Sequence, residues 1–310
     1  MLRKPARVSG PETGGAPPAF ALTCAPANRD EPAMTLPNFL IIGAAKAGTT
    51  SLYEHFRAHP EIFMPRLKEA RFFSYDGRGG KVKFPVQTLA EYEALFDGVR
   101  GEKAVGEATP HYLTFPEAAG RIRALLPEAK LVASLRNPVD RSYSIYQMNQ
   151  RNLARNAGVT YARAMQTDRS LQDSYSAHLE RFFALFPREQ IRIILLDDLE
   201  AKPEATLAGL FAFLGVDPGF TPDLSRVANP GGTPRIKLLH DLLANGKLIA
   251  ASRKVMPEAM VAPLKALRAR NLRRSTLPGP DRRAATAFFR DDILRTQDLI
   301  GRDLSHWLQA

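Results

Sequence analysis

The sequence contains almost no cysteine and no long apolar run. Cys24 is the only cysteine of the 310 residues, so the chain cannot form an intrachain disulfide bond or a multi-cysteine metal site. No stretch approaches the roughly 20 consecutive apolar residues that span a bilayer, and the N-terminus lacks the compact apolar segment of a secretory signal. From these absences we expect a protein without a transmembrane segment, located in the reducing cytoplasm.

Histidine is also scarce, and its spacing gives no convincing metal site. Of the six histidines, His55 and His59 lie four residues apart, but no third ligand is suggested near this pair. We therefore predict that the protein needs no metal ion.

Acidic residues are outnumbered, and the formal net charge of +11 at pH 7 is concentrated toward the C-terminus. Residues 235–283 hold twelve basic and three acidic side chains. These residues could form the solvated face of amphipathic helices. Alternatively, their positive potential could attract a polyanionic ligand, an acidic acceptor or a membrane surface. We do not expect nucleic acid as a partner.

The order of apolar segments predicts an α/β fold. Residues 1–36 are rich in proline, glycine and alanine and lack apolar periodicity, so we expect a disordered tail. From residue 37 onward, short apolar runs alternate with helical periodicities, as in a parallel sheet covered by helices. The expected strands are 39–42, 62–64, 104–106, 131–135 and 191–196. The expected helices are 88–97, 116–126, 138–150, 179–186, 203–214 and a last one that ends near residue 307.

The stretch 37–52 predicts an anion-binding turn. Its apolar run leads into Gly43-x4-Gly48, after which Thr49 or Thr50 could cap a helix. The free N–H groups and the dipole of such a helix favour a phosphate or sulfate. A Walker loop has its lysine directly after the second glycine, whereas Lys46 lies inside this turn. We expect a phosphate cradle that does not belong to an ordinary ATPase.

A second strand, 131–135, ends in the same way at Arg136. Ligands of doubly wound folds bind outside the carboxyl ends of parallel strands, so Lys46 and Arg136 are expected at one edge of the sheet. Two cationic sites at one edge suit a ligand with two separated anionic groups.

Five segments together resemble the sulfotransferases that use 3′-phosphoadenosine 5′-phosphosulfate (PAPS), most closely the carbohydrate (heparan-sulfate-like) and related bacterial branch. These segments are Lys-Ala-Gly-Thr-Thr-Ser at 46–51, Glu-Ala-Arg-Phe-Phe at 69–73, Gly-Glu-Ala-Thr-Pro at 106–110, Leu-Arg-Asn-Pro at 135–138 with Ser144, and Gly-Arg-Asp-Leu-Ser at 301–305. The resemblance covers roughly residues 37–308. It implies one sulfotransferase domain at 37–310, with a P-loop-like three-layer α/β/α architecture, a central parallel sheet and a C-terminal helical segment that includes 235–283.

The resemblance also assigns roles to individual residues. The residues implied to hold the 5′-phosphosulfate are Lys46, Ala47, Gly48, Thr49, Thr50 and Ser51. Arg136 and Ser144 are implied to hold the 3′-phosphate, and Arg235 to add positive charge from a loop that closes over the nucleotide. The family transfers the sulfuryl group without a metal. Tyr175 and His178 resemble a recurring family stretch, which makes them acceptor-site candidates.

Lys46 and Glu69 are the candidate catalytic residues. Lys46 could stabilise the negative charge that grows on the oxygen bridging phosphate and sulfate. Glu69 resembles the catalytic glutamate of the carbohydrate branch, and we expect partial burial to raise its pKa toward a useful range for a base. Glu107 and His111 are the substitutes for this role.

Two other functions remain open from the sequence. The run 191–198 ends an apolar strand at Asp197 and Asp198, as in a P-loop kinase or NTPase that binds magnesium there, although these acids could simply cap the strand. A non-catalytic protein could use the same turn and the basic segment to bind nucleotides or polyanions. The acceptor, a small molecule or a glycan with a hydroxyl or an amine, and the oligomeric state stay undetermined.

Overall fold

The computed structural model describes residues 35–75, 84–152, 158–224, 233–234, 272–273 and 276–309. The predicted tail at 1–36 lies outside this part of the chain, apart from its last two residues. Arg235 lies outside it as well, as does the basic segment 235–283 except for 272–273 and 276–283. The expectations for the tail, the basic segment and Arg235 therefore stay predictions.

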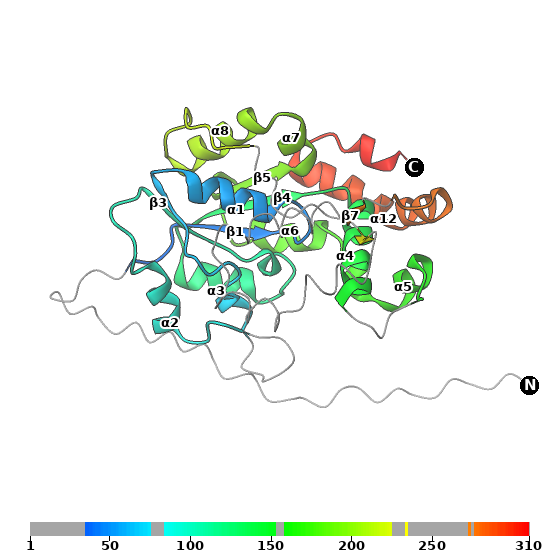
Figure 1. Cartoon of the computed structure of the whole chain (residues 1–310), viewed down its shortest axis with the longest axis horizontal. Coiled ribbons are helices and arrows are strands. Elements are labelled where there is room, and N and C mark those ends of the chain that lie inside the picture. Colours follow the sequence, from blue (N-terminus) through cyan, green and yellow to red (C-terminus); the bar gives the residue numbers. More distant parts are fainter. Residues whose placement is uncertain are drawn as a thin grey trace, which may run out of the picture.

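A five-stranded parallel sheet forms the centre of the protein (Figure 1). Its strands are β1 (Phe39–Gly43), β2 (Ile62–Phe63), β3 (Ala104–Ala108), β4 (Lys130–Leu135) and β5 (Ile191–Leu195). They lie in the order β2-β3-β1-β4-β5, and all neighbouring pairs are parallel. Strand β1 is therefore central, between β3 and β4. Two further strands, β6 (Thr233–Pro234) and β7 (Leu272–Arg273), form a separate antiparallel pair.

Helices cover both faces of the sheet, which confirms the three-layer prediction. Successive side chains of β1 point to opposite faces. Phe39 and Ile41 pack in a core with residues of the helices α1 (Thr49–Ala58), α7 (Leu196–Ala201) and α8 (Pro203–Leu214). Leu40 and Ile42 pack in a second core with residues of α3 (Ala118–Leu125), α6 (Ser176–Phe183) and α12 (Gly279–Ile300). In Figure 1, α7 and α8 lie above the sheet and α3 lies below it. Because both faces are covered, all five residues of β1 are buried.

The helices agree with most of the segments expected from the sequence. They are α1 (Thr49–Ala58), α2 (Leu89–Glu93), α3 (Ala118–Leu125), α4 (Pro138–Asn152), α5 (Tyr161–Thr167), α6 (Ser176–Phe183), α7 (Leu196–Ala201), α8 (Pro203–Leu214) and α12 (Gly279–Ile300). Single 3-10 turns include η1 (Phe72–Ser74), η2 (Ala94–Phe96), η3 (Pro110–Tyr112), η5 (Arg169–Leu171), η6 (Arg188–Gln190) and η8 (Ser305–Leu308). Within the described residues, no helix is both long and apolar enough to cross a bilayer.

Several element boundaries differ from the expectation. Helix α3 begins at Ala118 rather than at residue 116, and α6 spans Ser176–Phe183 rather than 179–186. Helices α5 and α7 were not expected at all. The last helix, α12, ends at Ile300 rather than near residue 307, because Gly301 adopts a left-handed conformation with φ 63° that terminates it. The chain then makes only the short turn η8 around Trp307.

Candidate active site

The turn after β1 leads directly into the N-terminus of α1. Gly48 is the N-cap residue of α1, its φ is 81°, and no side chain caps the helix. The prediction that Thr49 or Thr50 caps α1 is therefore wrong, since the cap position is left-handed and only glycine adopts that conformation without strain. The first turn of α1 also contains no acidic residue. The N–H groups of this helix end can thus receive an anion.

The two glycines of the turn are required for different reasons. A Cβ atom on Gly48 would lie 2.7 Å from Leu196 Cδ1, in addition to the strain of a positive φ. A Cβ atom on Gly43 would lie 2.6 Å from Leu113 Cβ. Gly43 therefore permits the close approach of the segment after η3. Between the glycines, Lys46 itself adopts a left-handed conformation with φ 68°.

Strand β4 and the residue after it hold this turn. The Ser134 hydroxyl donates to the Ala47 carbonyl oxygen at 2.5 Å, and Arg136 Nη1 donates to the Lys46 carbonyl oxygen at 3.4 Å. Lys46 and Arg136 therefore lie together at one edge of the sheet, as the strand-end argument predicts. Ser144 is partly buried in the second turn of α4, which begins just after Arg136.

The backbone of Arg136 is clamped by Tyr175. The Tyr175 hydroxyl donates to the Arg136 carbonyl oxygen at 2.8 Å and accepts from the Arg136 N–H at 3.3 Å. The backbone N–H groups of Tyr175 and Ser176 in turn donate to the Asp292 carboxylate of α12, at 2.8 and 2.9 Å. Burial raises the pKa of the Tyr175 hydroxyl to about 12. Tyr175, an acceptor-site candidate in the sequence, is thus engaged in positioning Arg136.

A buried ion pair braces the other side of the turn. Arg141, on α4, donates from Nε to the Ala45 carbonyl oxygen at 3.2 Å and from Nη2 to Asp173 Oδ2 at 2.6 Å. The side chain of Arg141 is 4% exposed and that of Asp173 is 19% exposed. Burial raises the pKa of Asp173, but hydrogen bonds and charges from His178 and Arg141 outweigh it, so the pKa lies below its usual value.

This ion pair continues into α6. His178 Nε2 bonds the second oxygen of Asp173, and Arg181 Nη2 donates to His178 Nδ1 at 2.7 Å. Because a guanidinium can only donate, Nδ1 accepts and the ring proton lies on Nε2. His178, the second acceptor-site candidate, is thereby held between two charged side chains. Arg141 and Asp173 were missed in the sequence, since 32 residues separate them and no motif links them.

Glu69 lies at the carboxyl end of β3, on the same edge as the turn. Its N–H donates to the Ala108 carbonyl oxygen at 3.0 Å, and its carboxylate bonds Lys68 Nζ at 3.2 Å and Arg71 Nη2 at 3.1 Å. Burial raises the pKa of Glu69, but the charges and hydrogen bonds of Lys68 and Arg71 outweigh burial and lower it. The expected net rise of the Glu69 pKa is therefore wrong. Lys68 lies where it can orient the carboxylate, and the Glu69 side chain stays 37% exposed.

The substitute bases differ from Glu69 in accessibility. Glu107, on β3, is fully buried, and burial raises its pKa to about 7. A buried carboxyl cannot contact an acceptor, so Glu107 is not an alternative base. His111, in η3, packs at 5.7 Å from the Phe115 ring, and desolvation together with the charge of Arg71 lowers its pKa.

The acids after β5 are held by the C-terminal segment. Asp197 Oδ2 accepts from Trp307 Nε1 at 2.8 Å and lies 3.1 Å from His306 Nε2. Asp198 forms an ion pair with Arg302 at 3.0 Å. Both acids lie in the first turn of α7, directly after the end of β5. Their side chains hold the C-terminus, which disfavours the magnesium-binding role that the kinase alternative requires.

His59, at the C-terminal end of α1, has a structural role. His59 Nδ1 accepts from the Glu61 N–H at 3.1 Å, His59 Nε2 lies 3.0 Å from the Asp217 carbonyl oxygen, and the ring packs 4.6 Å from Phe211. In the described part of the chain, no group of three or more histidine, cysteine or acidic side chains could hold a metal ion. The expected independence from metal stays a prediction.

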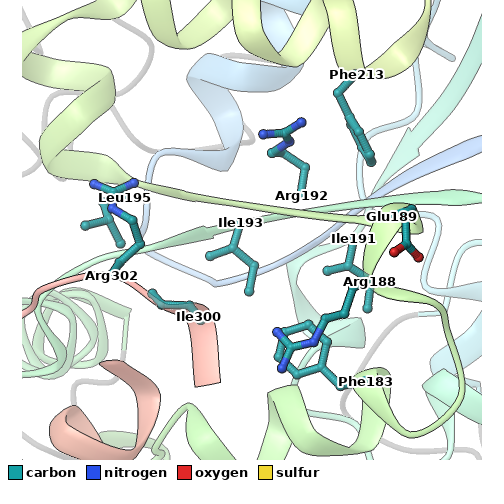
Figure 2. A pocket seen from close by; sticks show the side chains of 10 residues that line it. All are labelled: Phe183, Arg188, Glu189, Ile191, Arg192, Ile193, Leu195, Phe213, Ile300 and Arg302. Carbon is teal, nitrogen blue, oxygen red and sulfur yellow. The ribbon is translucent and has the colours of Figure 1, made fainter. Parts of the chain in front are cut away.

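A separate hollow of about 480 Å³ lies along β5, at the outer side of the sheet (Figure 2). Arg192 and Phe213 lie on one side of the strand, and Ile191 and Ile193 on the other. Residues of the turn between β1 and α1 do not line it, and neither does Glu69. This hollow is therefore distinct from the candidate active site.

A parallel sheet with an uncapped helix N-terminus after its central strand defines a P-loop-like α/β protein. The sequence matches the sulfotransferase domain family over residues 36–222, which is more than half of the chain. The chain therefore belongs to the sulfotransferase family.

Known proteins support this assignment. The chain is similar to membrane-associated sulfotransferase kil1 of Dictyostelium discoideum, with 37% identity over 124 residues, 40% of this chain and 25% of that protein. It is similar to bifunctional heparan sulfate N-deacetylase/N-sulfotransferase 2 of Homo sapiens, with 30% identity over 208 residues, 59% of this chain and 22% of that protein. The match thus spans a quarter or less of these two relatives.

A solved structure extends the similarity to most of the chain. The crystal structure of a sulfotransferase from Alicyclobacillus acidocaldarius is 29% identical, with a TM-score of 0.66, over 89% of this chain and 100% of that one. The similarity therefore includes residues beyond the matched family segment.

Proposed function

We propose that the protein is a sulfotransferase that uses PAPS and transfers a sulfuryl group to a hydroxyl or an amine of a carbohydrate acceptor. Family membership supports the reaction class. The carbohydrate acceptor is supported by a relative named for heparan sulfate N-sulfation. A cytoplasmic location stays a prediction.

The observation that carries the proposal is the contact between Arg136 Nη1 and the Lys46 carbonyl oxygen at 3.4 Å. It joins the cationic residue after β4 to the turn that precedes the uncapped end of α1. Two anion-binding groups at one edge fit a nucleotide with a 5′-phosphosulfate and a 3′-phosphate. The chemistry of the donor set therefore fits PAPS.

The turn and α1 would hold the 5′ end of PAPS. The N–H groups of Gly48, Thr49 and Thr50 would bind its phosphate, with Ala47 and Ser51 completing the loop. Bound PAPS would supply the sulfuryl group and a phosphate leaving group. Lys46 would stabilise the charge on that leaving phosphate.

The second phosphate and the acceptor would use other residues. Arg136 and Ser144 would bind the 3′-phosphate, with Arg235 as a further candidate. Glu69 is the proposed base, and its low pKa keeps the carboxylate ionised at neutral pH and ready to accept a proton from the acceptor. Lys68 and Arg71 hold both of its oxygens and so fix its direction.

Calorimetry with adenosine 3′,5′-bisphosphate (PAP) and with ATP plus Mg²⁺ tests the proposal. We expect binding of PAP only, since the site offers two phosphate-binding groups and lacks the Walker lysine. Preference for ATP plus Mg²⁺ would favour a kinase. Binding of PAP without sulfuryl transfer from PAPS to de-N-sulfated heparan sulfate or to other acceptor classes would favour a non-catalytic protein.

The Arg136→Ala variant tests the assignment of the 3′-phosphate. Loss of a charge-assisted contact should weaken PAP binding by about tenfold or more. AMP, which has only the 5′-phosphate, serves as the control ligand, and its affinity should be unchanged. An equal loss for both ligands would mean that Arg136 acts through the turn.

A further inference from the structure

A carboxyl group with no cationic partner among the described residues lies beneath the loop that carries Glu69. The side chain of Glu107 is 0% exposed in the middle of the sheet. Glutamate is rarely buried to this extent unless it is paired with a cation. The Thr109 hydroxyl donates a hydrogen bond to Glu107 Oε1. The presence of this group needs an explanation.

The surroundings of Glu107 are polar, and no cation of the described residues faces it. Tyr92 of α2 and Tyr112 of η3 lie beside the carboxyl, and burial together with the charge of Glu107 raises the pKa of both hydroxyls. Burial raises the pKa of Glu107. Hydrogen bonds from Thr109, Tyr112 and the Ala70 N–H lower this pKa, and the charge of Glu69 raises it. The 69–71 loop thus faces this carboxyl directly.

Thr109 connects Glu107 to that loop. Its hydroxyl donates to Glu107 Oε1 and accepts from the Arg71 N–H at 3.2 Å. Because a hydroxyl has one proton, donation to Glu107 directs its lone pairs toward Arg71. The neighbouring bond from the Glu69 N–H to the Ala108 carbonyl oxygen holds the start of the loop.

The loop needs such support because its backbone is unfavourable. Glu69 has φ 63° and Arg71 has φ 59°, and each left-handed non-glycine residue costs on the order of 1 kcal/mol. Arg71 also holds one oxygen of the Glu69 carboxylate, at 3.1 Å. A change in the Arg71 backbone would therefore turn the proposed base.

We propose that Glu107 is a positioning residue for sulfuryl transfer: through the Thr109 hydroxyl it fixes the 69–71 loop and the direction of the Glu69 carboxylate. The inference rests on the proposed function, in which Glu69 is the base. An apolar residue at position 107 would fill the same space. It would not, however, orient the hydroxyl that receives the Arg71 N–H.

The variant Thr109→Val removes the hydroxyl and keeps the shape. We expect kcat for transfer from PAPS to de-N-sulfated heparan sulfate to fall about tenfold, while PAP affinity stays within about twofold of wild type. Thr109→Ser, which restores the hydroxyl, should recover most of kcat. Thr296→Val is the matched control, since the hydroxyl of this buried threonine of α12 has no hydrogen-bond partner among the described residues.

Amide hydrogen exchange provides a readout that does not need an acceptor. Loss of the Thr109 acceptor should speed exchange at the Arg71 N–H by about tenfold in Thr109→Val and leave it unchanged in Thr296→Val. Unchanged exchange at Arg71 together with wild-type kcat would overturn the proposal.

A second pair of variants locates the effect at Glu107. In Glu107→Gln the amide oxygen can still accept from Thr109, so kcat should stay within about threefold of wild type. Glu107→Leu should resemble Thr109→Val, and the double variant should be no slower than the slower single variant. Additive losses in kcat would show that Glu107 does not act through Thr109 and would overturn the proposal.

These outcomes separate the inference from the proposed function. A wild-type protein that binds no PAP and transfers nothing would overturn the proposed function. A wild-type protein that transfers the sulfuryl group while Thr109→Val transfers it equally fast would overturn the positioning role alone.

Discussion

At the scale of single residues, the charged groups of the site occupy unusual backbone conformations. Lys46, Glu69 and Arg71 are the described residues other than glycine with positive φ, at 68°, 63° and 59°. Such conformations persist only where surrounding contacts hold them, and they cluster at functional sites. Here the contacts come from Arg136 on one side and from Thr109 on the other. The turn that contains Lys46 and the 69–71 loop therefore hold these conformations before a ligand binds.

Lys46 should affect the rate more than the affinity. If its ammonium stabilises charge that appears only as the bond to sulfur breaks, Lys46→Ala should lower kcat by roughly a hundredfold and change PAP affinity much less. Steady-state kinetics with PAPS and calorimetry with PAP measure the two effects. The control is Lys103→Ala, because Lys103 forms an exposed ion pair with Glu61 away from the turn. A proportionate loss of affinity and rate would assign Lys46 to binding.

Glu107 should also make stability depend on pH. Its folded pKa of about 7 lies above the ordinary 4.5, so the folded protein holds a proton that the unfolded chain has lost. Stability from this group is present below pH 4.5 and declines as the pH rises to about 7, by on the order of 3 kcal/mol. Glu107→Gln cannot titrate and should flatten this slope in urea unfolding measured from pH 5 to 8. A slope equal to that of wild type would contradict the raised pKa.

At the scale of elements, the site is built where three segments meet the carboxyl edge of the sheet. The turn after β1 supplies the anion site, the segment after β4 supplies Arg136, and the end of β3 supports Glu69. Helices α4 and α6 brace this arrangement from one side through Arg141, Asp173 and His178. The turn is consequently held by elements far away in the sequence.

The sequence predicted what is local and missed what depends on distant contacts. Strand ends at Gly43 and Leu135 follow from apolar runs and turn residues, and the alignment of parallel strands then brings Lys46 and Arg136 to one edge. The pairing of Arg141 with Asp173 follows only from how α4 packs, and no periodicity encodes it. The pKa of Glu69 was wrongly expected to rise, because the positions of Lys68 and Arg71 around the carboxylate depend on the left-handed backbone.

Removing only Arg141 from its ion pair with Asp173, which holds the turn against α4, should lower the free energy of unfolding. Arg141→Met leaves Asp173 without its cation and the Ala45 carbonyl oxygen without its donor, and should destabilise the protein by about 3–5 kcal/mol. Urea unfolding measures this loss. The double variant Arg141→Met, Asp173→Leu should recover part of it, since neither Arg141 nor Asp173 is then left without the other. A loss below about 1 kcal/mol for the single variant would mean that water replaces the guanidinium.

At the scale of the whole molecule, the C-terminal segment packs against the residues that hold the site. Trp307 is 1% exposed, and its ring lies 6.4 Å from the Tyr175 ring. Its carbonyl oxygen accepts from Asn137 Nδ2 at 3.3 Å, and its indole N–H donates to Asp197. One residue near the end of the chain therefore contacts the ends of β4 and β5 and the residue that clamps Arg136.

These contacts predict that the described parts of 37–310 unfold as one unit. Trp307 is the only tryptophan of the chain, so fluorescence reports on the C-terminal contacts while circular dichroism reports on the helices. Coincident urea transitions from both probes are expected, because the C-terminus shares its buried contacts with the sheet. PAP should shift both transitions together, since it binds the folded protein only. The variant Asn137→Ala, which removes one contact of Trp307, serves as the comparison and should lower both midpoints equally. A fluorescence transition that precedes the other would mean that the C-terminal segment detaches on its own, and that the clamp on Arg136 loosens before the sheet unfolds.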